Sequence, residues 1–213
     1  YEGSMGFVNY AEGIYVGYKF YETAAEEGLI KYEDMVQYPF GYGLSYTEFE
    51  QKMGELEEKD GQISVDVEVT NTGDVAGKDV VEVYYKPPYT NGGIEKASAN
   101  LIEFAKTDLL QPGESQIVTA TFSIEDMASY DENTAKAYVL EKGDYMISIN
   151  SDSHTVLDQK TYTADKDVVY KGENKRASDD TAATNVFEDA KGDVTYLSRA
   201  DHFANYEEAT AAP

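Results

Sequence analysis

Carboxylates are the most abundant side chains in this sequence that are capable of acid–base chemistry. The 213 residues include 41 aspartates and glutamates. Hydrolysis of a glycosidic bond uses a pair of carboxylates, one as acid and the other as base or nucleophile. Here the acidic residues are scattered over turns and over the exposed positions of expected strands, and no spacing distinguishes two of them. We therefore expect no catalytic residue in this chain.

Histidine and cysteine offer few other routes to chemistry. Cysteine is absent, which excludes disulfides, thiolate metal sites and a cysteine nucleophile. His154 and His202 are far apart in the sequence and neither lies near a Gly-x-Ser-x-Gly motif, so we interpret both as surface residues. Asp126, Asp131 and Glu132 carry oxygen ligands that suit calcium, but they lack the ordered spacing of a helix-loop-helix calcium site. We expect no metal and no cofactor.

Tyrosine is unusually frequent, and nine of the 19 tyrosines fall within residues 1–46. Aromatic faces stack on sugar rings, but they also fill interfaces between domains. Because these rings alternate with glycine and aliphatic residues, we favour an interface. Residues 38–46, which include Pro39, Gly41 and Gly43, are expected to form an irregular connector packed against a surface. The alternative is a loop that lines a carbohydrate site.

The net charge excludes two classes of partner. The 17 lysines and arginines give a formal charge of −24, and nucleic-acid binding requires a positive surface. Anionic membrane surfaces are disfavoured for the same reason, and no apolar run reaches the roughly 18 residues of a spanning helix. We expect a soluble chain. Because it begins with Tyr1 rather than methionine, we interpret it as a piece of a longer protein, whose compartment, cytoplasmic or secreted, stays open.

The elements that would position these side chains are mostly strands. Residues 63–70 alternate strictly between apolar and polar, as a strand with one buried face requires. The next strand covers residues 80–85, and the turn residues at 71–74 indicate a hairpin-like pair. About seven short strands separated by turns predict an antiparallel sandwich. The remaining elements are expected at residues 101–106, 117–124, 137–140, 145–150 and 159–163, with a short helical turn at 125–130.

The stretches on either side of these strands have a different character. Residues 14–21 are nearly all apolar or aromatic, which fits either a buried strand or a short packed helix. Residues 171–184 are polar and small, as in a linker. The tail that follows has apolar anchors too sparse for a core of its own, so we expect it to lie on a neighbouring domain. These anchors are Val186, Phe187, Val194, Tyr196, Leu197, Phe203 and Tyr206.

Several of these segments resemble the family 3 glycoside hydrolases, which include bacterial and fungal β-glucosidases. Residues 9–21 (Asn-Tyr-Ala-Glu-Gly-Ile-Tyr-Val-Gly-Tyr-Lys-Phe-Tyr) are similar to the segment Y-x-E-G-I-x-V-G-Y-R-Y-Y near the end of that family's α/β sandwich domain. Residues 38–49 are similar to its F-P-F-G-Y-G-L-S-Y-T-x-F signature. Residues 67–77 look like the opening of its fibronectin type III-like domain. The resemblance covers about residues 9–165.

This resemblance implies that the reactive groups lie elsewhere. The family's aspartate nucleophile belongs to a barrel domain, and its acid/base glutamate lies upstream of the segment that begins this chain, so Glu12 is not assigned that role. Lys19 stands where the family has arginine, and a lysine cannot reproduce a guanidinium fork. Residues 187–206 look like the connector of rearranged members in which the barrel follows this domain.

The sequence as a whole predicts an all-β, fibronectin type III-like sandwich with two flanking pieces. Residues 1–46 are expected to end an α/β domain, residues 47–165 to form the sandwich, and residues 166–213 to form a linker and an extended tail. The expected role is a non-catalytic accessory domain that stabilises the catalytic domains of the same parent chain, whose substrate would be a β-glucoside or oligosaccharide. The alternatives are a carbohydrate-binding module, to be tested at Tyr84, Tyr85 and Tyr89, and an adhesin-type interaction domain.

Overall fold

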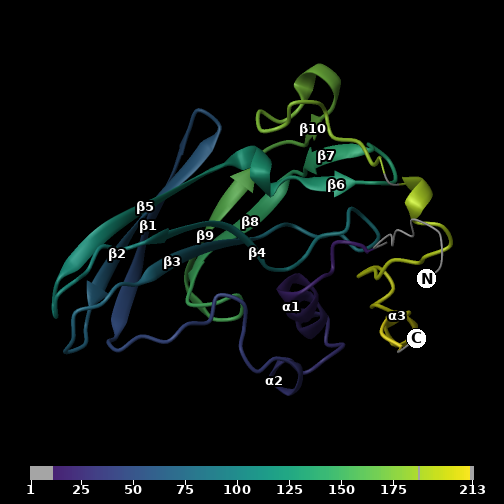
Figure 1. The fold of residues 1–213 in the computed structure, drawn as a ribbon. Coiled ribbons are helices and arrows are strands. Elements are labelled where there is room, and N and C mark those ends of the chain that lie inside the picture. Colours follow the sequence, from purple (N-terminus) through teal and green to yellow (C-terminus); the bar gives the residue numbers. More distant parts are fainter. Residues whose placement is uncertain (1–11, 187, 212–213) are drawn as a thin grey trace, which may run out of the picture.

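The computed structural model describes residues 12–186 and 188–211, and these form three antiparallel sheets with a few short helices (Figure 1). The first residues of the 9–21 motif and the expected anchor Phe187 lie outside the described residues. The strands are β1 (Phe49–Lys59), β2 (Gln62–Asn71), β3 (Val80–Lys86), β4 (Asn100–Lys106), β5 (Ser115–Ser123), β6 (Ser129–Asp131), β7 (Ala137–Leu140), β8 (Gly143–Asn150), β9 (Val156–Ala164) and β10 (Val168–Tyr170). The seven expected strands are present, and β1, β6 and β10 are additional.

Two of the sheets form the sandwich. One has the order β1-β2-β5 and the other the order β4-β3-β8-β9, and buried side chains from both make one hydrophobic core. The alternation predicted for β2 is confirmed, because Ile63, Val65, Val67 and Val69 are all fully buried. On β8 the same alternation sends Ile147 and Ile149 into this core, so that the residues between them face outward. The all-β sandwich is therefore confirmed.

The expected hairpin between β2 and β3 is wrong. These two strands lie in different sheets, and the hairpin partner of β2 is β1. Lys59 pairs with Gln62 across a two-residue loop of Asp60 and Gly61, whose φ angles are 52° and 77°. Positive φ at both central positions is what a type I′ hairpin turn requires, and Asp-Gly is one of its preferred sequences. The turn residues after β2 instead carry the chain across to the other sheet.

Gly61 gives the first testable prediction. Replacing it with alanine forces a Cβ into a left-handed backbone conformation, which is expected to cost about 1–2 kcal/mol of unfolding free energy. Gly43→Ala is the matched control, because no atom lies within 4 Å of the Cβ position there and its φ is not in the left-handed region, so the change should stay within about 0.5 kcal/mol. Denaturant unfolding of both variants measures the difference. Equal losses in the two variants would contradict the turn assignment.

The third sheet has the order β10-β7-β6. Residues 171–184, which the sequence suggested as a linker, follow β10 and contact this sheet and the turn after β5. Lys171 Nζ donates to the carbonyl of Ala135 at 2.7 Å, and the backbone N–H of Ala177 donates to Glu125 at 2.9 Å. The guanidinium of Arg176 lies 3.7 Å from the ring centre of Tyr138. This segment, which includes the 3₁₀ turn η2 (Gly172–Asn174), therefore runs along the sandwich. The expected helical turn after β5 is the 3₁₀ helix η1 (Ile124–Met127).

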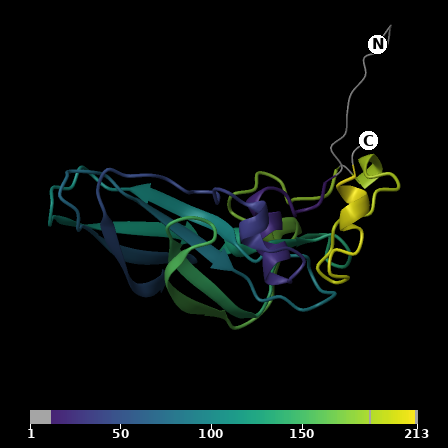
Figure 2. The same cartoon turned by 90° about the horizontal axis from the view of Figure 1, so that it is seen from below.

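The apolar stretch at residues 14–21 resolves into a helix that starts at Tyr18. Helix α1 (Tyr18–Glu26) is followed by the short helix α2 (Tyr32–Met35), and both lie beside the sandwich (Figure 2). The tail, with the turns η3 (Glu188–Ala190) and α3 (Tyr206–Ala209), lies at the same end of the molecule as α1. None of the helices in residues 12–186 and 188–211 is long and apolar enough to span a membrane.

The tail anchors find their partners in the N-terminal segment. Phe203 is only 1% exposed and packs with Tyr15, Phe20 and Ala24 in a second, smaller core. The Tyr15 and Phe203 rings meet edge to face with centres 5.0 Å apart, and Tyr206 stacks on Phe20 at 5.4 Å. The N-terminal segment and the tail each have too few apolar side chains for a core of their own, and together they form this one.

The irregular connector at residues 38–46 packs on the sandwich only in part. Phe40 stacks on Tyr18 with ring centres 4.6 Å apart, and its carbonyl accepts a hydrogen bond from the backbone N–H of Ser153 at 2.7 Å. Beyond it the expectation of a packed segment fails, because Leu44 is 88% and Tyr46 99% exposed. This uncharged stretch leaves apolar side chains in the open on a chain that is otherwise strongly acidic.

Candidate functional site

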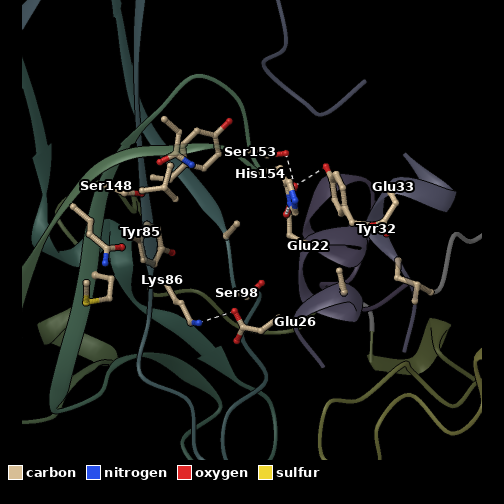
Figure 3. Close-up of a pocket in the computed structure, with 18 of the residues that line it drawn as sticks. Glu22, Glu26, Tyr32, Glu33, Tyr85, Lys86, Ser98, Ser148, Ser153 and His154 are labelled. Carbon is tan, nitrogen blue, oxygen red and sulfur yellow. Dashed lines mark hydrogen bonds and ion pairs between the residues drawn. The ribbon is translucent and has the colours of Figure 1, made fainter. Parts of the chain in front are cut away.

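A cleft of about 720 Å³ lies between the helices α1 and α2 and the outward face of the sheet at β3 and β8 (Figure 3). The sheet contributes side chains that alternation turns away from the core, among them Tyr84, Ser148 and Asn150. The helices contribute Glu22 and Tyr32. All five residues are buried, so the helices cover polar side chains of the sheet.

One buried carboxylate joins the helices to the sandwich in this cleft. Glu22 Oε1 accepts hydrogen bonds from the hydroxyls of Tyr32 and Ser153, both at 2.7 Å, and Oε2 lies 2.8 Å from His154 Nδ1. The rings of Tyr32 and His154 stack with centres 3.7 Å apart. Burial raises the pKa of the Tyr32 hydroxyl, and its hydrogen bond to Glu22 raises it further. We call Glu22, Tyr32, Ser153 and His154 the Glu22 cluster.

The Glu22 cluster contains the residue types of a hydrolytic triad but not its geometry. In a triad the imidazole stands between the serine and the acid, so that it can take the proton of the hydroxyl. Here Ser153 and His154 both bond directly to Glu22, and the serine hydroxyl donates to the carboxylate. The carboxylate of Glu22 therefore holds α2 and the loop after β8 in place, and His154 does not stand where it could take the proton of the Ser153 hydroxyl.

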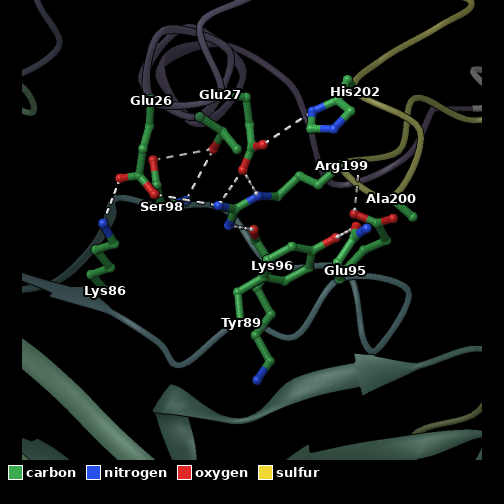
Figure 4. Close-up of polar contacts among 12 residues, drawn as sticks. Glu26, Glu27, Lys86, Tyr89, Glu95, Lys96, Ser98, Arg199, Ala200 and His202 are labelled. Carbon is green, nitrogen blue, oxygen red and sulfur yellow. Dashed lines mark hydrogen bonds and ion pairs between the residues drawn. The ribbon is translucent and has the colours of Figure 1, made fainter.

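A second set of polar contacts, centred on Arg199, binds the C-terminal tail to the rest of the chain (Figure 4). The side chain of Arg199, 5% exposed as a residue, donates to Glu27 Oε1 from Nε at 2.8 Å and from Nη2 at 2.6 Å, and reaches Glu26 at 3.3 Å. Its Nη1 donates to the carbonyl of Lys96 at 2.9 Å, and its guanidinium carbon lies 4.0 Å from the ring centre of Tyr89. Arg199 thus joins the tail, helix α1 and the loop between β3 and β4.

Glu95 extends this set of contacts, and we call Arg199, Glu27 and Glu95 the Arg199 cluster. Its carboxylate accepts hydrogen bonds from the hydroxyls of Tyr15 and Ser198 and, at 3.2 Å, from the backbone N–H of Arg199. Burial raises the pKa of Tyr15, and the hydrogen bond to Glu95 adds to that effect. The neighbouring Lys96 donates to the carbonyl of Pro88 at 2.7 Å. The loop that precedes β4 therefore supplies acceptors to both flanking segments, and the Lys96 bond holds the loop itself in shape.

The tyrosines named for the carbohydrate-binding alternative, Tyr84, Tyr85 and Tyr89, all make contacts within the chain. Tyr84 is 2% exposed and its hydroxyl donates to Glu82 at 2.8 Å, while Tyr85 packs against the main core. The face of Tyr89 is covered by Arg199. All three rings therefore make contacts within the fold, and Tyr84 and Tyr85 also line the cleft described above.

The two histidines are partly exposed, as expected of surface residues, but each faces a glutamate of the α1 region. His154 meets Glu22, and His202 Nδ1 lies 3.5 Å from Glu27. Lys19, also on α1, forms no ion pair with any residue that the structure describes, and burial lowers its pKa. Glu12 is exposed at the beginning of the described chain.

The acidic group considered for calcium has a structural use. Asp131 accepts hydrogen bonds from the backbone N–H groups of Asn133, Thr134 and Ala135 at 2.9–3.0 Å, and so fixes the turn between β6 and β7. Burial alone would raise the pKa of this carboxyl, but the three backbone donors outweigh it and the net pKa is lowered. Across the described residues, no three histidine or acidic side chains are grouped so as to hold a metal ion.

The lowered pKa of Asp131 predicts a pH dependence. Since the folded-state pKa lies below the ordinary value near 4, the carboxylate stabilises the fold above that pH, and this contribution is lost as the pH falls through the folded-state value. Because Asp131 is only partly buried, solvent screens the interaction and we expect less than about 1 kcal/mol. Asp131→Asn should flatten the stability curve below about pH 4. Thermal melts of both proteins between neutral pH and strong acid measure this, and parallel curves would refute it.

The residues that build these clusters were missed by sequence reasoning. Glu22, Glu27 and Glu95 are three among 41 acidic residues, and nothing in their spacing distinguishes them. Arg199 did carry a signal, because it is one of only two arginines in the chain. An arginine that is rare in an acidic sequence is a reasonable candidate for a buried ion pair.

The two facing sheets define the class of this domain as a fibronectin type III-like β-sandwich, and residues 79–153 match the family model described as a fibronectin type III-like domain. The resemblance to family 3 glycoside hydrolases is confirmed by relatives that extend beyond this domain. β-Glucosidase A of Butyrivibrio fibrisolvens is 38% identical over 182 residues, which cover 76% of this chain and 21% of the relative. A β-glucosidase of Ruminococcus albus is 39% identical over 160 residues, covering 73% of this chain and 16% of the relative.

Solved structures give the same result. A β-glucosidase from Paenibacillus barengoltzii superposes with a TM-score of 0.67 at 38% identity, covering 80% of this chain and 19% of that one. A GH3 β-glucosidase of Bifidobacterium adolescentis gives a TM-score of 0.64 at 30% identity, covering 78% of this chain and 23% of that one. The chain therefore shares its fibronectin type III-like domain with the family 3 β-glucosidases. It spans about a fifth of the length of the relatives it matches.

Proposed function

We propose that this chain is the non-catalytic accessory region of a family 3 β-glucosidase. In this proposal residues 1–46 end an α/β domain, residues 47–165 form the sandwich, and residues 166–213 lead toward a further domain. The parent cleaves β-glucosidic bonds with a pair of carboxylates that lies outside this chain. The observation that carries the proposal is the similarity to the Paenibacillus barengoltzii β-glucosidase over 80% of the chain.

The two polar clusters support a stabilising role. The Glu22 cluster ties α1 and α2 to the loop after β8, and the Arg199 cluster ties the tail to α1 and to the loop before β4. The sandwich is thus the body against which the segments from both sides are held. An accessory domain that fixes flanking segments in this way would orient whatever domains those segments join.

The catalytic part of the proposal is tested by assaying two proteins side by side. The purified 213-residue chain is expected to give no turnover of an aryl β-glucoside, while the parent protein hydrolyses it with retention of the anomeric configuration. Turnover by the chain alone, abolished by substitution of one of its own carboxylates, would overturn the non-catalytic assignment. A parent that hydrolyses no aryl β-glycoside would overturn the β-glucosidase assignment.

A further inference from the structure

The cleft between the helices and the sheet contains polar groups that the fold does not use. The Ser148 hydroxyl and the Gln159 side-chain amide line it and make no hydrogen bond within residues 12–186 and 188–211. Asn150, which is 2% exposed, has an amide oxygen without any hydrogen-bond partner there. Buried polar atoms are nearly always paired, so an orphan at a cleft points to a missing donor.

We propose that this cleft binds a small neutral polyol, between glycerol and a single hexose in size. Its volume of about 720 Å³ falls in the range of small-molecule sites, which is about 300–1,000 Å³. Ser148, Asn150 and Gln159 together offer both acceptors and donors on one wall. Hydroxyl groups, which accept and donate at once, are the ligand groups that complement such a wall.

The charges of the lining argue for an uncharged ligand. Three carboxylates and two ammonium groups line the cleft, and three of these five groups are already partnered within the chain. Glu22 is satisfied by Tyr32, Ser153 and His154, and Lys86 is paired with Glu26 at 2.6 Å. The other two charged groups of the lining, Lys31 and Glu33, are exposed and opposite in sign, so the lining offers neither an anion nor a cation an excess of opposite charge. A neutral ligand leaves the existing pairs intact.

Apolar surface completes the site. Ile30, Met146 and Val156 also line the cleft, and Val156 is half exposed. A polyol with C–H groups on one side and hydroxyls on the other matches this combination of apolar and polar walls. The amide oxygen of Asn150 is covered in the present conformation, so we expect the side chain to turn toward the ligand and exchange its Nδ2 hydrogen bond to the carbonyl of Asp152.

The inference is tested by titrating the ¹⁵N-labelled 213-residue chain with glycerol and with glucose. Saturable amide shifts are expected at β8, at β9 and at α1. Ser148→Val fills the site and removes its hydroxyl, and should weaken binding about tenfold or more. Gln159→Ala lies on an exposed strand, where folding is not at risk, and should weaken it more modestly. Ser64→Val is the matched control, because Ser64 lies in the other sheet and bonds to Thr121 at 2.8 Å; it should leave the affinity unchanged.

Several results would overturn the proposal. Shifts that never saturate, or that are the same in wild type and Ser148→Val, would mean that the cleft is not a binding site. Saturable shifts with inorganic phosphate in place of the polyols would mean that the ligand class is wrong. None of these outcomes depends on the activity of the parent, so the cleft can fail as a polyol site while the accessory role stands, and the reverse holds as well.

Discussion

Arg199→Ala is expected to weaken the attachment of the tail by about 3–5 kcal/mol, because removing one member of a buried ion pair leaves the other uncompensated. The substitution removes both donors to Glu27 and the donor to the Lys96 carbonyl. Glu27 is then left partly buried without a cationic partner other than the exposed His202. Arg199→Lys should recover only part of the loss, since an ammonium group cannot reproduce the forked contact.

Amide hydrogen exchange measures this effect directly. Faster exchange is expected in α1 and in residues 195–206, with little change in β2 and β5 of the sandwich. Lys52→Ala is the control, because the Lys52–Glu50 pair is exposed and is expected to contribute less than about 1 kcal/mol. If Arg199→Ala changed exchange no more than Lys52→Ala does, the Arg199 cluster would not hold the tail.

Ile147→Ala is expected to destabilise the sandwich itself by about 2–5 kcal/mol, because the lost methyl and methylene groups leave a cavity at the centre of the main core. Ile117→Ala is the matched control. Its side chain is 63% exposed on β5, so the same chemical change should cost less than about 0.5 kcal/mol. Denaturant midpoints of the two variants give the comparison. Similar losses at both positions would mean that the core is not where the structure has it.

The sandwich was predictable where burial follows from local periodicity. The alternation of Ile63, Val65, Val67 and Val69 can satisfy only one structure, a strand with one face in a core, and the other expected strands carry weaker versions of the same pattern. The helix at Tyr18 was not predictable in this way. The apolar and aromatic run at residues 14–21 includes only the first turn of α1, and a run this short fits a strand as well as a helix.

The pairing of strands was less accessible than their positions. Strand β1 has only Met53 buried along its length, and its many charged residues obscure the alternation that identifies a strand. The Asp60–Gly61 turn was the available signal for the β1–β2 hairpin. The turn residues after β2 looked equally favourable, although they lead to another sheet. A turn sequence specifies a change of direction and leaves open which sheet receives the next strand.

The candidate site was hidden for a different reason. Its contacts join residues that are 131 positions apart, as in Ser153 and Glu22, or 172 apart, as in Arg199 and Glu27. Such contacts exist only after the flanking segments have folded back on the sandwich. The sequence suggested that the N-terminal segment and the tail pack against other domains. In the structure they pack largely against each other and against the loop before β4.

The charged side chains that obscure the alternation of β1 also disfavour the pairing of this strand with another molecule. β1 is an edge strand, and one side of its backbone is free to template a further strand from another molecule. Glutamates and lysines along it, with the irregularity in register between Met53 and Leu56, make that addition unfavourable, because like charges would be brought together and the hydrogen-bonding row is interrupted. The acidic side chains of β1 therefore disfavour aggregation through this edge of the sheet.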